Sequence, residues 1–175
     1  MITIFENYNI NIRKDIITKE LRSKLIHHSA LDITFLENIG KTIDKKTMIE
    51  LLNTIENQNF NNILFVAVEK YDLLLVKYLI ELGIDINHIN INGYNALILA
   101  TDLLNGKTFG DKERSNLFQI VKLLIENNIN WNQISNLNKD FMSYLNLGVI
   151  NYLKLQYKDK YDNYMKHKKS KKFNL

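Results

Sequence analysis

The chain has 175 residues and a formal net charge of +4, and 46% of its residues are hydrophobic. This length suffices for one domain with a buried core, and the hydrophobic content excludes a disordered chain. Cysteine is absent, which excludes disulfide bonds, a thiolate nucleophile and a cysteine-based zinc site. The N-terminus lacks the layout of a signal peptide, and the longest apolar runs are too short to span a bilayer. We therefore expect a cytoplasmic protein.

The N-terminal third, residues 1–58, shows no clear repeat. Residues 15–39 and 44–57 have the amphipathic spacing of two or three helices, and Asp44 or Thr42 is placed to cap the last of them. Asn62 follows so soon that we predict no room for a full connecting loop. We interpret the region as a helical cap or a degenerate repeat, because repeat proteins need polar ends.

A repeat becomes visible when the middle of the chain is aligned with itself. Residues 76–87 match residues 121–132 at seven of twelve positions with an offset of 45, and residues 62–68 align with 95–101 at an offset of 33. A 33-residue unit with a 12-residue insertion explains both offsets. The polar segment 104–116 contains two glycines and is predicted to form a loop.

Each unit is predicted to contain two helices and an extended finger. Residues 63–68 and 75–80 carry apolar stripes at helical spacing, and Gly83 ends the second helix. Asn128 occupies that place in the second copy, and Asn also tolerates the left-handed conformation. Apolar and polar residues alternate after Gly83, and Gly93 then allows a tight turn into the next helix. Neither helix can bury its stripe alone, so the units must stack.

These residues resemble the ankyrin-repeat family over about 60–145. That family's unit runs roughly Asp-x-x-Gly-x-Thr-Pro-Leu-His-x-Ala-Ala, a turn, and Ile-Val-x-Leu-Leu-Leu-x-x-Gly-Ala-Asp-Val-Asn. The matching positions are Gly93, Leu97 and Ala100; Val76, Leu79, Gly83, Asp85 and Asn87; and Ile120, Val121, Leu123, Leu124 and Asn132. Where the family has Thr-Pro-Leu-His, this chain has Asn-Ile-Leu-Phe at 62–65 and Asn-Ala-Leu-Ile at 95–98. The loss of Pro and of the Thr and His hydrogen bonds predicts a looser entry into each first helix.

The resemblance implies an all-α fold, an ankyrin-like α-solenoid of stacked helix-turn-helix repeats with short β-hairpin fingers and helical caps. We divide the chain into a cap at 1–58, repeats at 59–148 with the insertion at 104–116, and a capping helix with a basic tail at 149–175. The tail region from Lys154 holds eight Lys and two Asp, a net charge of +6, which leaves −2 for residues 1–153. Residues 166–172 are predicted to be frayed.

No catalytic or cofactor motif is found. The Gly-Lys-Thr triplets at 40–42 and 106–108 lack the upstream glycine of a phosphate-binding loop. His27 and His28 point about 100° apart on a helix and make a poor metal chelate. We therefore predict a protein that is not an enzyme and that needs no metal or cofactor.

The resemblance implies a monomeric interaction module that binds a partner protein along its concave face and fingers. The implied contact residues are Glu69, Lys70, His88, Ile89, Ile91, Asn92, Tyr94, Asp102 and Leu103. Ile89 and Ile91 have an alternative explanation as finger-to-finger packing. Lys107, Lys112 and Arg114 add contacts from the insertion, unless the insertion is merely tolerated.

Three roles stay open for such a module. One is a host-directed adaptor of viral or intracellular-bacterial type, acting in the host cytoplasm or nucleus. The second is an inhibitor or immunity protein for a toxin enzyme. The third is binding of nucleic acid or an anionic surface through the basic tail. The alternative explanation of the tail sequence is a capping helix whose aromatic residues face inward, followed by a solubilising end.

Overall fold

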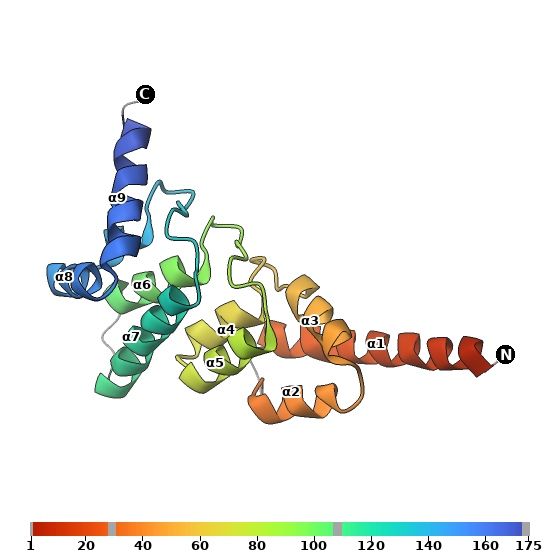
Figure 1. Ribbon diagram of the computed structural model, residues 1–175. Helices are drawn as coiled ribbons and strands as arrows, with labels where there is room; N and C mark the ends of the chain where they lie inside the picture. The colour runs from red at the N-terminus through yellow and green to blue at the C-terminus, as the bar shows by residue number, and fades with distance from the viewer. Residues whose placement is uncertain (1, 28–30, 107–109, 173–175) are drawn as a thin grey trace.

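The computed structural model describes residues 2–27, 31–106 and 110–172, and the regular secondary structure in this part of the chain consists of helices, without a β-strand. Figure 1 shows an elongated molecule with the two chain ends at opposite extremes. The helices are α1 (Ile2–His27), α2 (Ile33–Gly40), α3 (Lys45–Thr54), α4 (Ile63–Glu69), α5 (Leu73–Leu82), α6 (Ala96–Gly106), α7 (Asp111–Glu126), the 3-10 helix η1 (Phe141–Tyr144), α8 (Leu147–Gln156) and α9 (Lys158–Lys172).

Two helix pairs form the centre of the molecule. The pair α4 and α5 stacks on the pair α6 and α7, so that α4 lies beside α6 and α5 lies beside α7 (Figure 1). The facing side chains are fully buried, among them Leu64 and Val68 of α4 and Leu97 of α6. This arrangement confirms the predicted all-α solenoid of stacked helix-turn-helix units.

The first helix of each unit begins at an equivalent capping residue. The side-chain oxygen of Asn62 accepts hydrogen bonds from Leu64 N and Phe65 N, and that of Asn95 accepts one from Ile98 N at 3.0 Å. Asp140 caps η1 in the same way. These three positions are separated by the offsets of 33 and 45 seen in the sequence. We expected the loss of the family's Thr and His to remove hydrogen bonds at the starts of these helices. The capping residues supply hydrogen bonds there instead.

The fingers are tight turns instead of the predicted β-hairpins. They span 57–61, 90–94 and 135–139, and each is closed by the same pair of backbone hydrogen bonds, such as Asn90 N to Tyr94 O at 3.0 Å and Gly93 N to Asn90 O at 2.9 Å. Side chains of Asn57, Asn90 and Ser135 accept further backbone N–H groups inside the turns. Such local bonds compete with the strand ladder.

The ends of the second helices follow the prediction. Gly83 ends α5 with a left-handed φ of 103°, and Asn128 follows α7 with a φ of 62°. Both residue types tolerate this conformation better than residues with bulky side chains. The solenoid therefore uses the same chain reversal twice, with a different residue each time.

The N-terminal region contains three helices, and Asp44 caps α3 by accepting a hydrogen bond from Thr47 N at 3.0 Å. Helix α1 extends away from the body (Figure 1), and Leu21 and Leu25 near its C-terminal end are buried. Helix α3 ends at Thr54, which leaves enough chain for a first finger at 57–61. The expectation that no finger fits before Asn62 is therefore wrong.

Most of the insertion is helical, so the prediction of a loop over 104–116 is wrong. Helix α6 has 11 residues where α4 has 7, and α7 has 16 where α5 has 10. The insertion lengthens both helices at the end where they meet. Asp111 and Glu113 in the first turn of α7 favour this helical start because they interact well with the positive end of the helix dipole.

The C-terminal region folds into two helices where one was predicted, because the chain bends at Tyr157. Helix α9 then continues to Lys172, beyond the start of the expected frayed segment. Tyr164 is buried, as expected for an inward aromatic of the capping helix, and Leu153 is buried as well, whereas Leu155 is 78% exposed.

Helix α9 is attached to η1 by a polar cluster around Asp140. Lys168 Nζ and the Tyr164 hydroxyl donate to Asp140 Oδ2 at 2.7 Å and 2.6 Å, and Ser143 donates to Oδ1. Burial by itself would raise the pKa of Asp140, but the hydrogen bonds from Lys168, Tyr164 and Ser143 outweigh it and hold that pKa below its ordinary value.

This cluster predicts a pH dependence for the docking of α9. A carboxylate with a lowered pKa contributes stability above its ordinary pKa of about 3.9, and this contribution is lost as the pH falls through the lower folded value. We expect the fluorescence of Trp131, whose ring lies 6.2 Å from that of Tyr164, to change over this acid range. The change should be smaller in Asp140→Asn, which keeps the cap but carries no titrating group, and equal changes in both proteins would contradict the prediction.

Candidate functional site

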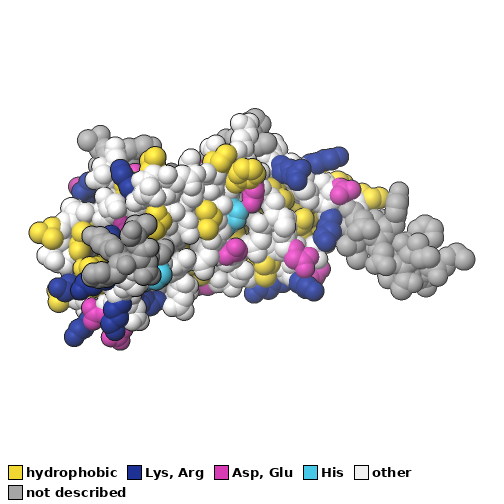
Figure 2. Space-filling view, turned by 90° about the horizontal axis from the view of Figure 1, so that it is seen from above, with side chains coloured by type: hydrophobic (Ala, Val, Ile, Leu, Met, Phe, Trp, Pro, Cys, Tyr) yellow, Lys and Arg dark blue, Asp and Glu magenta, His cyan; other side chains and the backbone are white. Residues whose placement is uncertain are grey.

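Five exposed apolar side chains lie on the three fingers or directly before them, and we call this surface the fingertip ridge. Their exposed fractions are 50% for Phe60, 47% for Ile89, 52% for Ile91, 40% for Ile134 and 69% for Leu137. An apolar group exposed to water costs free energy, so five such groups gathered along neighbouring fingers indicate an interaction surface. Viewed from above, Lys and Arg side chains lie mainly towards the two ends of the molecule, with the fingers between them (Figure 2).

Hydrogen bonds between neighbouring fingers hold the ridge together. Ile91 N donates to Asn59 O at 3.1 Å, which joins the second finger to the first. On the other side, Asn136 donates from its backbone N to Asn92 O at 2.9 Å and from its side chain to Ile91 O at 2.8 Å. The tips therefore have a fixed spacing, which lowers the entropy cost of binding a partner.

Asn90 is the central hydrogen-bonding residue below the ridge. Its side-chain oxygen accepts from Asn92 N and Tyr94 N, both at 3.0 Å, and its amide donates to the side chain of Asn61 at 2.9 Å. Asn90 and Asn61 are both buried, with exposed fractions of 8% and 4%. One side chain thus fixes its own finger and the contact with the preceding one.

Phe60 has an unusual backbone conformation for a large side chain. Its φ is 55°, and the equivalent positions of the other fingers are Gly93 at 74° and Asn138 at 57°. Gly and Asn adopt this region readily, whereas a bulky side chain costs about 1–2 kcal/mol there. An exposed aromatic side chain at a strained position suggests a role in binding more than a role in stability.

The first two fingers and the starts of the helices that follow them carry no Asp, Glu, Lys or Arg, and the third finger carries Lys139 at its end. Residues 57–68, 86–101 and 127–138 are without any of these four residue types, and Asp140 then caps η1. A surface with so few formal charges lacks the basic groups that dominate binding to a phosphate backbone. It suits a partner whose contacting face is apolar and neutral.

His88 is less available than predicted. Its Nε2 lies 2.7 Å from Phe60 O and 3.4 Å from Glu56 Oε1, and its ring meets the edge of Phe65 at a centroid distance of 5.8 Å. His88 therefore connects the first two fingers. Ile89, Ile91 and Asn92 are exposed.

Tyr94 and Asp102 lie together but point into a hydrogen-bond network between units. The Tyr94 hydroxyl is 2.9 Å from the Tyr144 hydroxyl and donates to Asp102 Oδ2 at 3.3 Å. Burial raises the pKa of Tyr94 above its ordinary value, and the bond to Tyr144 and the charge of Asp102 raise it further. Tyr94 thus has a structural role in joining α6 to η1, in addition to any contact with a partner.

The other predicted contact residues are scattered. Glu69, at the end of α4, accepts a hydrogen bond from Asn61 at 3.1 Å, and Lys70 is the residue that ends this helix. Leu103 is partly buried against the core. Lys107 lies outside the described residues. Lys112 and Arg114 are exposed on the first turn of α7, not on a loop.

Sequence reasoning missed Phe60, Ile134 and Leu137. The repeat offsets were sufficient to find two of them, because Ile134 follows Ile89 by 45 positions and Phe60 precedes Gly93 by 33. The first finger was overlooked because its unit has lost the rest of the repeat signature.

Two further searches of the described residues gave no candidate. No group of three or more His, Asp or Glu side chains is close enough to hold a metal ion in this part of the chain. No helix within the described ranges has the length and apolar content needed to cross a bilayer.

Comparison with known proteins agrees with the repeat architecture. Residues 64–125 match the family model described as ankyrin repeats in many copies. The chain is similar to an ankyrin repeat domain from Acinetobacter baumannii AYE, at 24% identity and a TM-score of 0.45, over 66% of this chain and 58% of that one. It is also similar to a second ankyrin repeat protein, at 18% identity and a TM-score of 0.28, over 66% of this chain and 92% of that one. No curated protein matches the chain.

The alignment thus spans less than two thirds of the Acinetobacter domain. Stacked helix pairs joined by equivalent fingers define a helical-repeat protein of the solenoid class. The family match over residues 64–125 shows that the segment from α4 to α7 is similar to ankyrin repeats. Ankyrin repeats are in general modules for protein–protein interaction and are in general not enzymes.

Proposed function

We propose that the protein binds a partner protein through the fingertip ridge, with Phe60, Ile91 and Leu137 as the main contacts. The observation that carries the proposal is Phe60, a half-exposed aromatic residue held at a φ of 55° where the other fingers have Gly and Asn. Aromatic side chains contribute strongly to interfaces because they bury a large area at a small cost in side-chain entropy.

The scarcity of formal charge on the fingers, of which Lys139 is the exception, favours a protein partner over a nucleic acid. Residues 57–61, 90–94 and 135–138 offer apolar side chains and amide groups. Both are suited to the buried centre of a protein interface, where charged residues are depleted. The adaptor role and the role of an inhibitor of another protein both use such a surface, and the identity of the captured partner distinguishes them.

The test is capture of the partner from a lysate of the source organism, with single substitutions on the ridge. Phe60→Gly, Ile91→Ser and Leu137→Ser should each weaken capture by at least about tenfold. Raising the salt concentration from about 0.05 to 0.5 M should change capture little, because screening acts on charges. Phe60→Gly should in addition leave the free energy of unfolding unchanged or raise it by about 1 kcal/mol, since it removes the backbone strain.

The matched control is Leu74→Ser on α5. Leu74 and Leu137 are both 69% exposed, but Leu74 lies away from the fingers. Leu74→Ser should therefore capture the partner as well as the natural chain does. Recovery of nucleic acid alone, with capture that is lost at high salt and kept in the three ridge variants, would contradict the proposal and favour the basic α9.

A further inference from the structure

A cavity bordered by the described residues lies at the far end of the solenoid from the N-terminus, away from the fingertip ridge. It has a volume of about 450 Å³ and is lined by the end of α6, the start of α7, the end of η1 and the start of α8. Its origin is the insertion, because long helices α6 and α7 are followed by η1, which has only four residues. A short helix placed against two lengthened ones cannot fill the space between them.

The floor of this cavity is apolar. It is formed by Leu104, Phe118, Leu145 and Val149, and by the ring of Tyr144. Phe118 is further supported by Tyr152, whose ring centroid lies 5.2 Å from its own. A floor of aliphatic and aromatic groups accepts an apolar side chain of a ligand.

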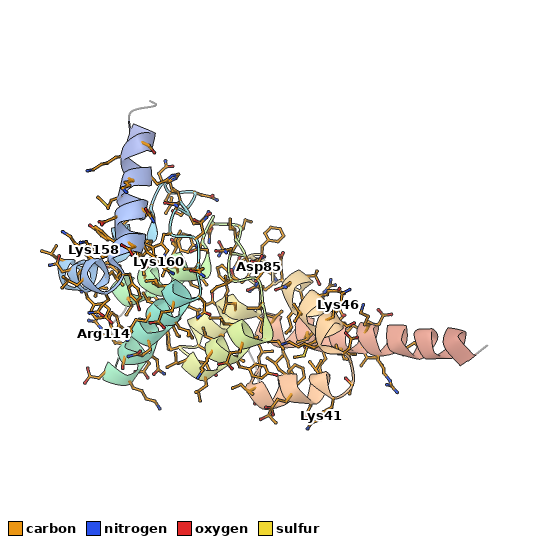
Figure 3. All side chains as sticks on the ribbon, viewed as in Figure 1. Lys41, Lys46, Asp85, Arg114, Lys158 and Lys160 are labelled. Atoms are coloured by element: carbon orange, nitrogen blue, oxygen red, sulfur yellow. The ribbon has the colours of Figure 1, made fainter. Side chains whose placement is uncertain are left out.

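The rim carries one charge of each sign. Asp111 and Arg114 are exposed, three residues apart on the first turn of α7, and both line the cavity. Figure 3 shows Arg114 between the start of α7 and α8. Neither residue forms an ion pair within 4 Å in the described part of the chain. Both charges therefore remain available to a ligand.

We propose that this cavity binds a free apolar amino acid as its zwitterion. The carboxylate would pair with Arg114, the ammonium group with Asp111, and the side chain would occupy the apolar floor. A simple anion fits less well, because Asp111 and Glu113 on the same helix turn would repel it. The volume lies near the lower end of the range for ligand pockets, which agrees with a small ligand. This inference does not depend on the proposed function of the ridge.

The test is calorimetric titration of the whole protein with L-leucine, L-phenylalanine and L-tryptophan. Two derivatives each remove one charge of the ligand: L-phenylalaninamide lacks the carboxylate, and N-acetyl-L-phenylalanine lacks the ammonium group. Arg114→Gln should lower the affinity for L-phenylalanine roughly tenfold and leave the affinity for L-phenylalaninamide unchanged. Asp111→Asn should likewise lower the affinity for L-phenylalanine and leave the affinity for N-acetyl-L-phenylalanine unchanged. This cross-pattern assigns each charge to its partner.

Lys112→Gln is the control variant, since Lys112 is exposed on the same turn of α7 but does not line the cavity. It should bind L-phenylalanine like the natural chain. Circular dichroism should show the same helix content in all three variants, because all three positions are exposed. The proposal is overturned if none of the three amino acids binds at concentrations up to about 10 mM. It is equally overturned if the natural chain binds the amide as well as it binds L-phenylalanine, or if Arg114→Gln and Asp111→Asn both bind L-phenylalanine normally.

Discussion

Replacing Trp131 by Ala is expected to lower the free energy of unfolding by about 3–5 kcal/mol, the usual range for a large aromatic residue removed from a core. Trp131 is 6% exposed. Its ring lies 5.2 Å from that of Phe141 and 6.2 Å from that of Tyr164, and these two rings are 5.7 Å apart. Trp131 follows α7, Phe141 begins η1 and Tyr164 belongs to α9, so one side chain holds three elements together.

Urea unfolding followed by far-UV circular dichroism measures this loss. Trp131→Phe is the matched variant, because it keeps an aromatic ring and removes the indole Nε1, which is buried without a hydrogen-bond partner among the described residues. We expect Trp131→Phe to lower the free energy of unfolding by less than about 2 kcal/mol. Equal losses for the two variants would show that the indole itself, and not the aromatic packing, supports the C-terminal cap.

Part of the positive charge of the C-terminal helices has a structural role. Lys168 binds Asp140 and Tyr164, and Lys160 donates to Ile125 O at the end of α7 at 2.6 Å. These two lysines therefore stabilise the solenoid. The sequence alone shows them as members of a basic run, because nothing in a run of Lys residues indicates which of them will meet a carboxylate or a helix end.

The repeat itself was predictable because packing imposes it. The stripes of α4 to α7 must be apolar at helical spacing in every copy, and Gly83 and Asn128 must tolerate a left-handed backbone. These constraints leave a signal in one sequence. The fingers are held by hydrogen bonds of Asn57, Asn90 and Ser135, which are different residue types performing the same function. That substitution explains why the turns were mistaken for hairpins.

The lengths of the helices were harder to predict from the sequence than their presence. An insertion that is polar and rich in glycine reads as a loop, yet most of its residues extend α6 and α7. The stripe of α7 begins only at Leu117, so the preceding exposed turn has no periodic apolar signal to mark it as helical. The cavity beside Asp111 and Arg114 results from this extension and has no counterpart in the sequence pattern.

Replacing Asn90 by Ala is expected to lower the free energy of unfolding by about 2–3 kcal/mol, because it leaves buried polar groups without partners. The lost bonds are those to Asn92 N, Tyr94 N and the side chain of Asn61. Since these bonds fix the second finger against the first, Asn90→Ala should also weaken partner capture, even though Asn90 is too buried to touch a partner. Thermal and urea unfolding measure the first effect, and capture from lysate measures the second.

The control for this prediction is Asn92→Ala, two positions away on the same finger. The Asn92 side chain is exposed and makes no hydrogen bond with the described residues, so its loss should change the free energy of unfolding by no more than about 0.5 kcal/mol. If Asn90→Ala unfolds like the natural chain, the finger does not depend on this side chain. If it is destabilised but captures the partner normally below its melting temperature, the positions of Ile89 and Ile91 do not need Asn90, and the rigid ridge is not required for binding.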